Sequence, residues 1–334
     1  MKSLGMEYRP PADDIERRVA DLVSQLEVGD FDRDAFRGIV NKDFGIKPVS
    51  PGTPPSISLL AADSSTASHN LRYSALWSIH CVCLYALFNG HGNEDPLVGH
   101  GAIPYGSVLY DSSADVGSFD PYWMLEQQMG CIRIAREYND LAENAGRLAR
   151  EGVPVDIALV DGSLSTNSEN ISFKPDLKAS RSAIAAEERL LSLGRVVSMA
   201  EDSHASDIAR RMGLNMSNLM LFHLVLDANE YVVERGRFNV CYVKLPGKKV
   251  RYLGDVCPPV TTRWEFSYPG FERDLSALAG IWMAEDDIIH PQVYPLRIAD
   301  YLTRRLKAGG IIDKVVREMQ PDLAFREMRE SYFD

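Results

Sequence analysis

The sequence lacks the segments that mark membrane and exported proteins. No uninterrupted apolar run reaches the roughly 18 to 20 residues that a helix needs to cross a bilayer. The longest candidate, residues 73–88, is broken by a serine, a histidine and two cysteines. The N-terminal residues show no apolar core of the kind found in signal peptides. We therefore expect a cytoplasmic protein without a membrane segment.

Several common functional motifs are also missing. The chain has no glycine-rich phosphate loop, no dinucleotide-binding fingerprint and no Gly-x-Ser-x-Gly turn. Its five cysteines are scattered, and Cys81 and Cys83 have no second pair at zinc spacing, so buried reduced thiols are expected. The net charge of −11 argues against a broad basic surface for nucleic acid. It is compatible with a narrow binding channel, and with carboxylates whose charge metal ions partly cancel.

The chain does contain alternating strand-like and helix-like segments, which predict an α/β protein. Residues 1–50 form an expected N-terminal helical region, with helices over 12–40. Residues 51–334 fit a ribonuclease-H-like mixed sheet flanked by helices. Residues 89–117 are expected to be mostly loop with one strand near 107–110, and residues 165–178 a mobile polar loop. Strands are expected at 57–63, 73–88, 155–161, 195–200, 231–233, 238–245 and 261–268, and the later helices at 121–150, 179–193, 206–212, 274–285 and 295–307.

Two of the expected strands end in an acid followed by small residues. Residues 57–62 are mostly apolar and lead into Asp63, and residues 155–160 lead into Asp161. Such short, nearly continuous apolar runs are typical of strands that are buried on both faces. Each acid alone is explained equally well by a turn or a helix cap. Together they predict one acidic site at a sheet edge, assembled from distant parts of the chain.

A third acid is expected from the helix at 121–150, which contains Glu126, Glu137 and Glu143. With about 1.5 Å per helical residue and about 3.3 Å per strand residue, Glu137 comes back roughly level with Asp161. Glu137 is therefore the preferred candidate, and a solvated surface charge is the alternative. Asp202 also follows an apolar run, and it either joins this edge or caps the next helix.

Clustered carboxylates indicate a particular chemistry. Mg²⁺ and Mn²⁺ prefer oxygen ligands, and two such ions can stabilise both the attacking and the leaving oxygen of a phosphodiester. The predicted site is therefore a nuclease centre that holds Mn²⁺ or Mg²⁺ as a pair of ions. Asp63, Glu137 and Asp161 are the catalytic candidates and, with Asp300, the metal-ligand candidates.

Four segments together resemble the NurA nuclease family over residues 55–306. They are Ala-Ala-Asp63-Ser64-Ser65, Leu-Val-Asp161-Gly162-Ser163-Leu164, Val196 to Ser203, and Tyr294-Pro295-Leu296 to Ala299. The resemblance implies a ribonuclease-H-like, metal-dependent DNA nuclease with 5′-to-3′ exonuclease and single-strand endonuclease activity. It also implies a homodimer that works with the hexameric HerA translocase, a ring ATPase, in DNA end resection and repair. The family's strand acids map onto Asp63 and Asp161, and its helix glutamate onto Glu137 or Glu143.

Two departures from the family pattern keep a second hypothesis open. The first family motif usually reads Asp-Gly-Ser, whereas this chain has Ser64 after the acid. The C-terminal helix usually offers a histidine where this chain has Asp300, which leaves His290 as a substitute and Tyr294 as an accessory candidate. The alternative to a nuclease is a weakly active or inactive adaptor of the same fold that docks on a ring ATPase.

Overall fold

The computed structural model describes residues 31–51, 56–71, 74–89, 109–119, 124–172, 178–200, 203–248, 258–285, 292–306 and 309–318. The helix expected before residue 30, together with Asp202 and His290, lies outside these residues. No helix in the described ranges is long and apolar enough to cross a bilayer.

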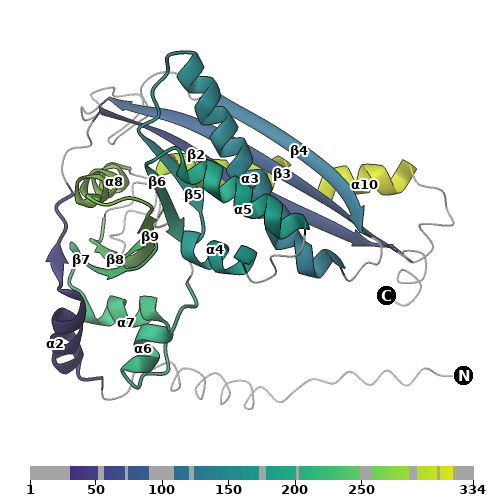
Figure 1. Cartoon of the computed structure of the whole chain (residues 1–334). Helices are drawn as coiled ribbons and strands as arrows, with labels where there is room; N and C mark the ends of the chain where they lie inside the picture. The colour runs from purple at the N-terminus through teal and green to yellow at the C-terminus, as the bar shows by residue number, and fades with distance from the viewer. Residues whose placement is uncertain are drawn as a thin grey trace, which may run out of the picture.

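A nine-stranded mixed sheet forms the centre of the described part of the chain (Figure 1). Its strand order is β1-β7-β8-β9-β6-β5-β2-β3-β4. Strand β5 is parallel to β2 and to β6, and the other neighbouring pairs are antiparallel. The strands are β1 (Lys47–Pro48), β2 (Ser56–Asn70), β3 (Ala75–Asn89), β4 (Leu109–Phe119), β5 (Ile157–Asp161), β6 (Val196–Ala200), β7 (Glu230–Arg235), β8 (Asn239–Leu245) and β9 (Val260–Phe266).

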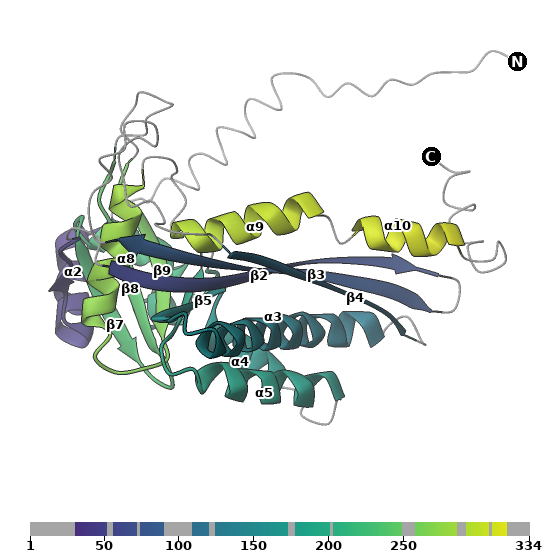
Figure 2. The ribbon, with the colours of Figure 1, turned by 90° about the horizontal axis from the view of Figure 1, so that it is seen from above.

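Helices cover both faces of this sheet (Figure 2). One face is covered by α3 (Met124–Arg150), α4 (Leu164–Ser172) and α5 (Lys178–Leu191). The opposite face is covered by α8 (Glu272–Ala284), α9 (Tyr294–Leu306) and α10 (Gly309–Glu318). Around β7 and β8 pack α2 (Arg33–Phe44), α6 (Asp207–Arg211) and α7 (Asn218–Val225). The expected α/β class, a mixed sheet flanked by helices, is confirmed.

Two buried clusters lie on the two faces of the central strands. Leu59 and Ala61 of β2 face α8 and α9, whereas Leu60 and Ala62 face α3 and α5. Because consecutive strand residues point to opposite faces, burial on both sides requires an unbroken apolar run. This is the physical reason for the continuous sequence before each acid.

The central strands have unequal lengths, and this creates a break in the sheet. Strand β5 ends at Asp161 and β6 ends at Ala200, whereas β2 continues to Asn70. The expectation that the first strand ends at Asp63 is therefore wrong. Asp63 lies in the middle of β2 and pairs with Val82 of β3. Beyond Ala62, β2 has no pairing with β5, so one edge of β2 is uncovered at this level.

Three further expectations need correction. The region 89–117 contains part of β4, which runs over Leu109–Phe119 rather than near 107–110. The polar sequence of β4 lacks the apolar pattern by which a strand is predicted. The strand is stabilised by backbone pairing with β3 and not by burial of its side chains. Residues 164–172 form α4 instead of a mobile loop, since Leu164 and Ile171 are buried. Helices α7 and α10 were not expected.

Candidate active site

Asp63 and Asp161 lie on adjacent strands at the same level. Ala62 pairs with Val160, and both of these residues face α3. The next residue on each strand therefore points to the α9 face, and neighbouring strands are only about 4.8 Å apart. Asp63 is 4% exposed. The two acids that the sequence pattern singled out are thus neighbours on one face, at the point where β5 stops.

A hydrogen-bond donor holds each of these carboxylates. The Thr303 hydroxyl on α9 donates to Asp63 Oδ2. Gln292 Nε2 donates to Asp161 Oδ1 at 2.6 Å. Directly after Asp161, Gly162 has a φ of 77°, which a residue with a Cβ adopts only at a cost. This glycine lets the chain turn from β5 into α4 immediately after the acid.

Glu137 approaches the break from the other face of the sheet. It lies on α3 and is only 1% exposed, so the alternative of a solvated surface charge does not hold. Ser64 Oγ of β2 donates to Glu137 Oε2 at 2.6 Å, and Arg133 Nη1 lies 3.2 Å from the same oxygen. Glu143 on the same helix has a side chain that is 70% exposed and pairs with Arg189 at 3.7 Å. The structure therefore brings Glu137, and not Glu143, to the break.

Asp300 joins the group from α9, one turn before Thr303. Arg304 Nε donates to Asp300 Oδ1 at 2.7 Å, and the negative charge of Asp300 raises the pKa of both Asp63 and Asp161. Tyr294 starts the same helix but contacts other groups: its backbone N–H donates to Glu285 Oε1 at 2.7 Å. Of the remaining candidates, Asp202, His290 and the side chain of Glu126 lie outside the described residues.

Burial and mutual repulsion raise the pKa values of the clustered acids. Burial is the largest cause for Asp63, whose pKa rises to about 7, with the charges of Asp161 and Asp300 adding to it. Burial likewise raises the pKa of Glu137 to about 8, against the opposing effect of Arg133. The pKa of Asp161 is raised by burial as well. Without a bound cation, burial thus favours the protonated form of these acids.

These properties fit a site for divalent cations in donor type and charge. Carboxylate oxygens are the ligands that Mg²⁺ and Mn²⁺ prefer. Within the described ranges, no three His, Cys, Asp or Glu side chains are already arranged around a common point that could hold an ion. Instead, the oxygens accept hydrogen bonds from Thr303, Gln292 and Ser64. Binding an ion would therefore require the carboxylates to turn toward one another.

The donors around the cluster were not predicted from the sequence. Thr303 could have been found, because it lies three residues after Asp300 and shares its helix face. Gln292 had no local signal, since it lies 131 positions from its partner Asp161. Ser64 stands out in the sequence only as a departure from a motif, and its bond to Glu137 gives it a structural role.

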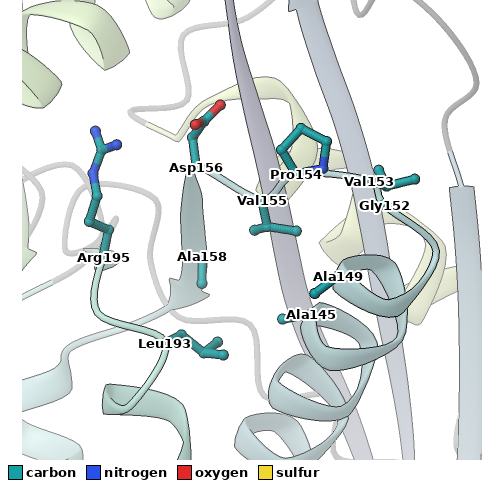
Figure 3. A pocket seen from close by; sticks show the side chains of 10 residues that line it. All are labelled: Ala145, Ala149, Gly152, Val153, Pro154, Val155, Asp156, Ala158, Leu193 and Arg195. Carbon is teal, nitrogen blue, oxygen red and sulfur yellow. The ribbon is translucent and has the colours of Figure 1, made fainter.

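A cavity of about 430 Å³ lies at the opposite end of β5, away from the acids (Figure 3). Its lining is mainly apolar, including Ala145, Ala149 and Leu193, with Asp156 and Arg195 among the lining residues. Asp156 Oδ2 already accepts hydrogen bonds from the backbone N–H and the hydroxyl of Ser58, both at 2.8 Å. The acid in this cavity therefore ties the start of β5 to β2.

Comparison with solved structures identifies proteins of similar fold. No protein-family model and no curated protein sequence matches the chain. The crystal structure of the NurA nuclease from Sulfolobus solfataricus superposes with a TM-score of 0.58 over 93% of this chain and 99% of that one, at 12% identity. A NurA structure with manganese gives 0.56 over 93% and 100%, also at 12% identity. A NurA structure bound to dAMP and manganese gives 0.54 over 94% and 99%, at 11% identity.

The fold is thus a ribonuclease-H-like mixed sheet with helices on both faces. More specifically, it is the NurA-like fold, present over nearly the full length of the chain. At 11 to 12% identity this similarity shows the fold alone, and the chemistry depends on the residues that this chain carries at the site.

Proposed function

We propose that the protein is a divalent-metal-dependent DNA nuclease that hydrolyses phosphodiester bonds at the break in the sheet. The observation that carries this proposal is the gathering of Asp63, Asp161, Glu137 and Asp300 from four separate elements into one negative cluster. Burial disfavours the charged form of these acids, and groups with such raised pKa values are typical of functional sites. The NurA-like fold supports the same conclusion.

Asp63, Asp161, Glu137 and Asp300 are the residues that would hold Mn²⁺ or Mg²⁺. Such ions supply Lewis-acid stabilisation of the charge that develops on a phosphodiester during hydrolysis. The surrounding residues have separate roles. Thr303 and Gln292 orient the two strand acids, and Ser64 of β2 orients Glu137 of α3. The acids must lose their protons to act as ligands, so protons and metal ions compete for the site.

The finer activities are part of the same proposal. The protein would act as a 5′-to-3′ exonuclease and a single-strand endonuclease, as a homodimer, together with a HerA-type hexameric ATPase in end resection. The NurA-like fold over 93% of the chain supports this assignment. The division into a helical region at 1–50 and a nuclease domain at 51–334 also remains a proposal. Residues 31–50 contain α2 and β1, and β1 pairs with β7 of the sheet.

An inactive adaptor of the same fold is the competing function. Ser64 and Asp300 favour it, because both replace residues that the NurA pattern contains. Ser64, however, donates a hydrogen bond to Glu137, and Asp300 contributes a carboxylate to the cluster. Both substitutions thus preserve a set of oxygen ligands.

A cleavage assay separates these two functions. Purified protein is incubated with end-labelled single-stranded and duplex DNA in Mn²⁺, in Mg²⁺ and in a chelator. We expect cleavage only with a divalent ion, and a loss of more than about 100-fold in Asp63→Asn and Asp161→Asn, since losing even an outer partner of a metal ligand costs about 10- to 100-fold. Glu143→Gln is the matched control for Glu137→Gln, because its exposed carboxylate lies on the same helix. Absence of cleavage under all conditions would favour the adaptor.

A further inference from the structure

A polar groove of about 900 Å³ lies on the sheet face that α4 covers. One wall is formed by α4, with the hydroxyl groups of Ser165, Ser168 and Ser172. The other wall is formed by the residues around α6 and by the turn between β7 and β8. In Figure 1, α4 lies to the right of the strands β7 to β9 and α6 lies below them. A groove of this volume accommodates part of one polymer strand and not a second macromolecule.

Arg263 lies in this groove and is 7% exposed. Its Nη2 donates to Ser165 Oγ at 2.6 Å, and its Nη1 donates to Ser203 Oγ at 3.1 Å. Glu265 lies 2.9 Å from the same guanidinium. The Nε atom of Arg263 is buried and has no hydrogen-bond partner. The groove is thus built around a fixed guanidinium that is paired with Glu265 and whose buried Nε has no partner.

The outer part of the groove carries two arginines that the fold does not use. Arg210 on α6 and Arg235 at the end of β7 are exposed, and no hydrogen bond or ion pair engages either side chain in the described part of the chain. Three acids also line the groove: Glu169 on the α4 wall, and Asp207 and Glu234, which are close to Arg211 at 3.7 and 3.6 Å. The charge of the latter two is therefore partly balanced, which leaves Arg210 and Arg235 available for an anionic ligand.

The groove lies on the sheet face from which Glu137 approaches the break, whereas Asp63 and Asp161 point to the opposite face, and a short piece of chain at the break joins the groove wall to Asp161. Ser165, which Arg263 contacts, follows Asp161 by four residues through the turn at Gly162. Ser163 Oγ donates to Glu265 Oε1 at 2.6 Å, and the backbone N–H of Ser165 donates to Glu265 Oε2 at 2.7 Å. The position of the groove wall is thus tied to the position of the acid.

We propose that this groove binds the sugar-phosphate backbone of a single nucleic-acid strand whose scissile bond lies at the carboxylate cluster. The proposal rests on the proposed nuclease function and adds the path of the substrate. Arginine and hydroxyl donors bind phosphate oxygens without reading bases, so binding is independent of sequence. A chain with a net charge of −11 repels nucleic acid elsewhere, which makes a local cationic path necessary.

The test measures binding of an oligothymidylate of about 20 nucleotides, longer than the roughly 4 to 16 nucleotides that one site covers. Fluorescence anisotropy in a chelator gives the Kd without cleavage, at several salt concentrations. For Arg210→Glu combined with Arg235→Glu we expect a Kd at least about tenfold weaker. The slope of log Kd against log salt should fall by about 1.4, or about 0.7 for each phosphate of a single strand that is no longer neutralised.

The control for these variants is a reversal of the same charge away from the groove. Arg273 lines a different cavity, together with Ser56 and Asp156. Arg273→Glu is therefore compared with each single groove variant, Arg210→Glu and Arg235→Glu, because all three make the same change in net charge. Arg273→Glu should keep the affinity for the oligonucleotide.

Hydrolysis of bis(para-nitrophenyl) phosphate, a small diester that does not reach the groove, is measured in parallel with Mn²⁺. The groove variants and Arg273→Glu should all keep this activity. Unchanged affinity and salt slope in the double groove variant would overturn the groove proposal, even if the diester is hydrolysed. If the wild-type protein hydrolyses no diester but the groove variants bind the oligonucleotide more weakly, the groove proposal is supported and the nuclease function is refuted. Circular dichroism and the urea midpoint verify that each variant is folded.

Discussion

Asp63 and Glu137 approach the site from opposite faces of the sheet, yet their carboxylates interact electrostatically within one cluster. This is possible because β5 ends at Asp161, so no strand separates the two faces beside the uncovered edge of β2. Burial raises the pKa of both acids, and the Asp63 charge adds to the effect on Glu137. At the scale of single residues, the site consists of buried acids whose charged forms would be more stable in water.

The raised pKa of Glu137 predicts how stability depends on pH without metal. The pKa is about 8 in the folded protein and near the ordinary 4.5 when unfolded. Between these values the folded state binds more protons, so the free energy of unfolding falls as pH rises. We expect urea unfolding in a chelator to show lower stability at pH 8 than at pH 5. Glu137→Gln should flatten this dependence, whereas Glu143→Gln should follow the wild type. An equally steep fall in Glu137→Gln would contradict the assignment.

The Ser64 hydroxyl is predicted to lower the pKa of Glu137. Removing its hydroxyl in Ser64→Ala deletes a donor to the Glu137 carboxylate, which should raise the pKa of Glu137 further and cost about 1 kcal/mol of stability. The pH at which Mn²⁺-dependent cleavage reaches half its maximum should therefore move upward. Ser65→Ala is the control, since the Ser65 hydroxyl donates to the backbone oxygen of Thr303 and to no carboxylate. Identical pH profiles for both variants would refute a positioning role for Ser64.

Sequence reasoning at this scale located the acids but not their partners. Asp63 and Asp161 could be selected because each follows a short apolar run, which is visible in the sequence. Glu137 could be placed by counting rises along a helix and a strand. Gln292 could not be found in this way, because its contact with Asp161 spans 131 positions, and Thr303 had only the indirect signal of lying three residues after Asp300.

The turn from β5 into α4 is the element that links the acids to the groove. Gly162 allows the reversal, Ser163 accepts the backbone N–H of Thr166 at 3.0 Å, and Glu265 of β9 binds both Ser163 and Ser165. Helix α4 is difficult to predict from the sequence because its residues are mostly polar. Its stability comes from this capping bond and from burial of Leu164 and Ile171, which only the tertiary structure determines.

A substitution at this turn tests its backbone conformation. No atom lies within 4 Å of a Cβ placed on Gly162, so Gly162→Ala creates no clash and only forces a side chain into positive φ. We expect a loss of about 1 to 2 kcal/mol in the free energy of unfolding, together with weaker cleavage because Asp161 is the preceding residue. Gly146→Ala within α3 is the control, and it should stabilise the protein by about 0.5 to 1 kcal/mol. Equal effects of the two substitutions would be incompatible with the turn geometry.

At the scale of the whole molecule, unequal strand lengths produce the site. The α/β class and most strand positions follow from apolar periodicity, which local sequence carries. The extension of β2 to Asn70 does not, because residues beyond Asp63 are polar and their strand conformation depends on pairing with β3. Packing of Ile312 from α10 against Leu71 and Leu76 then supports the end of this extension. The sheet break is therefore a property of tertiary pairing.

Calorimetric titration with Mn²⁺ tests most directly whether these acids share divalent ions. The pKa values of about 7 for Asp63 and about 8 for Glu137 mean that both are partly protonated near pH 7. Binding should therefore release protons near pH 7, detected as a buffer-dependent heat, and release almost none at about pH 9. Asp161→Asn should bind Mn²⁺ far more weakly. Wild-type affinity in Asp161→Asn, or no Mn²⁺ binding by the wild type, would contradict a metal-dependent carboxylate centre at the break in the sheet.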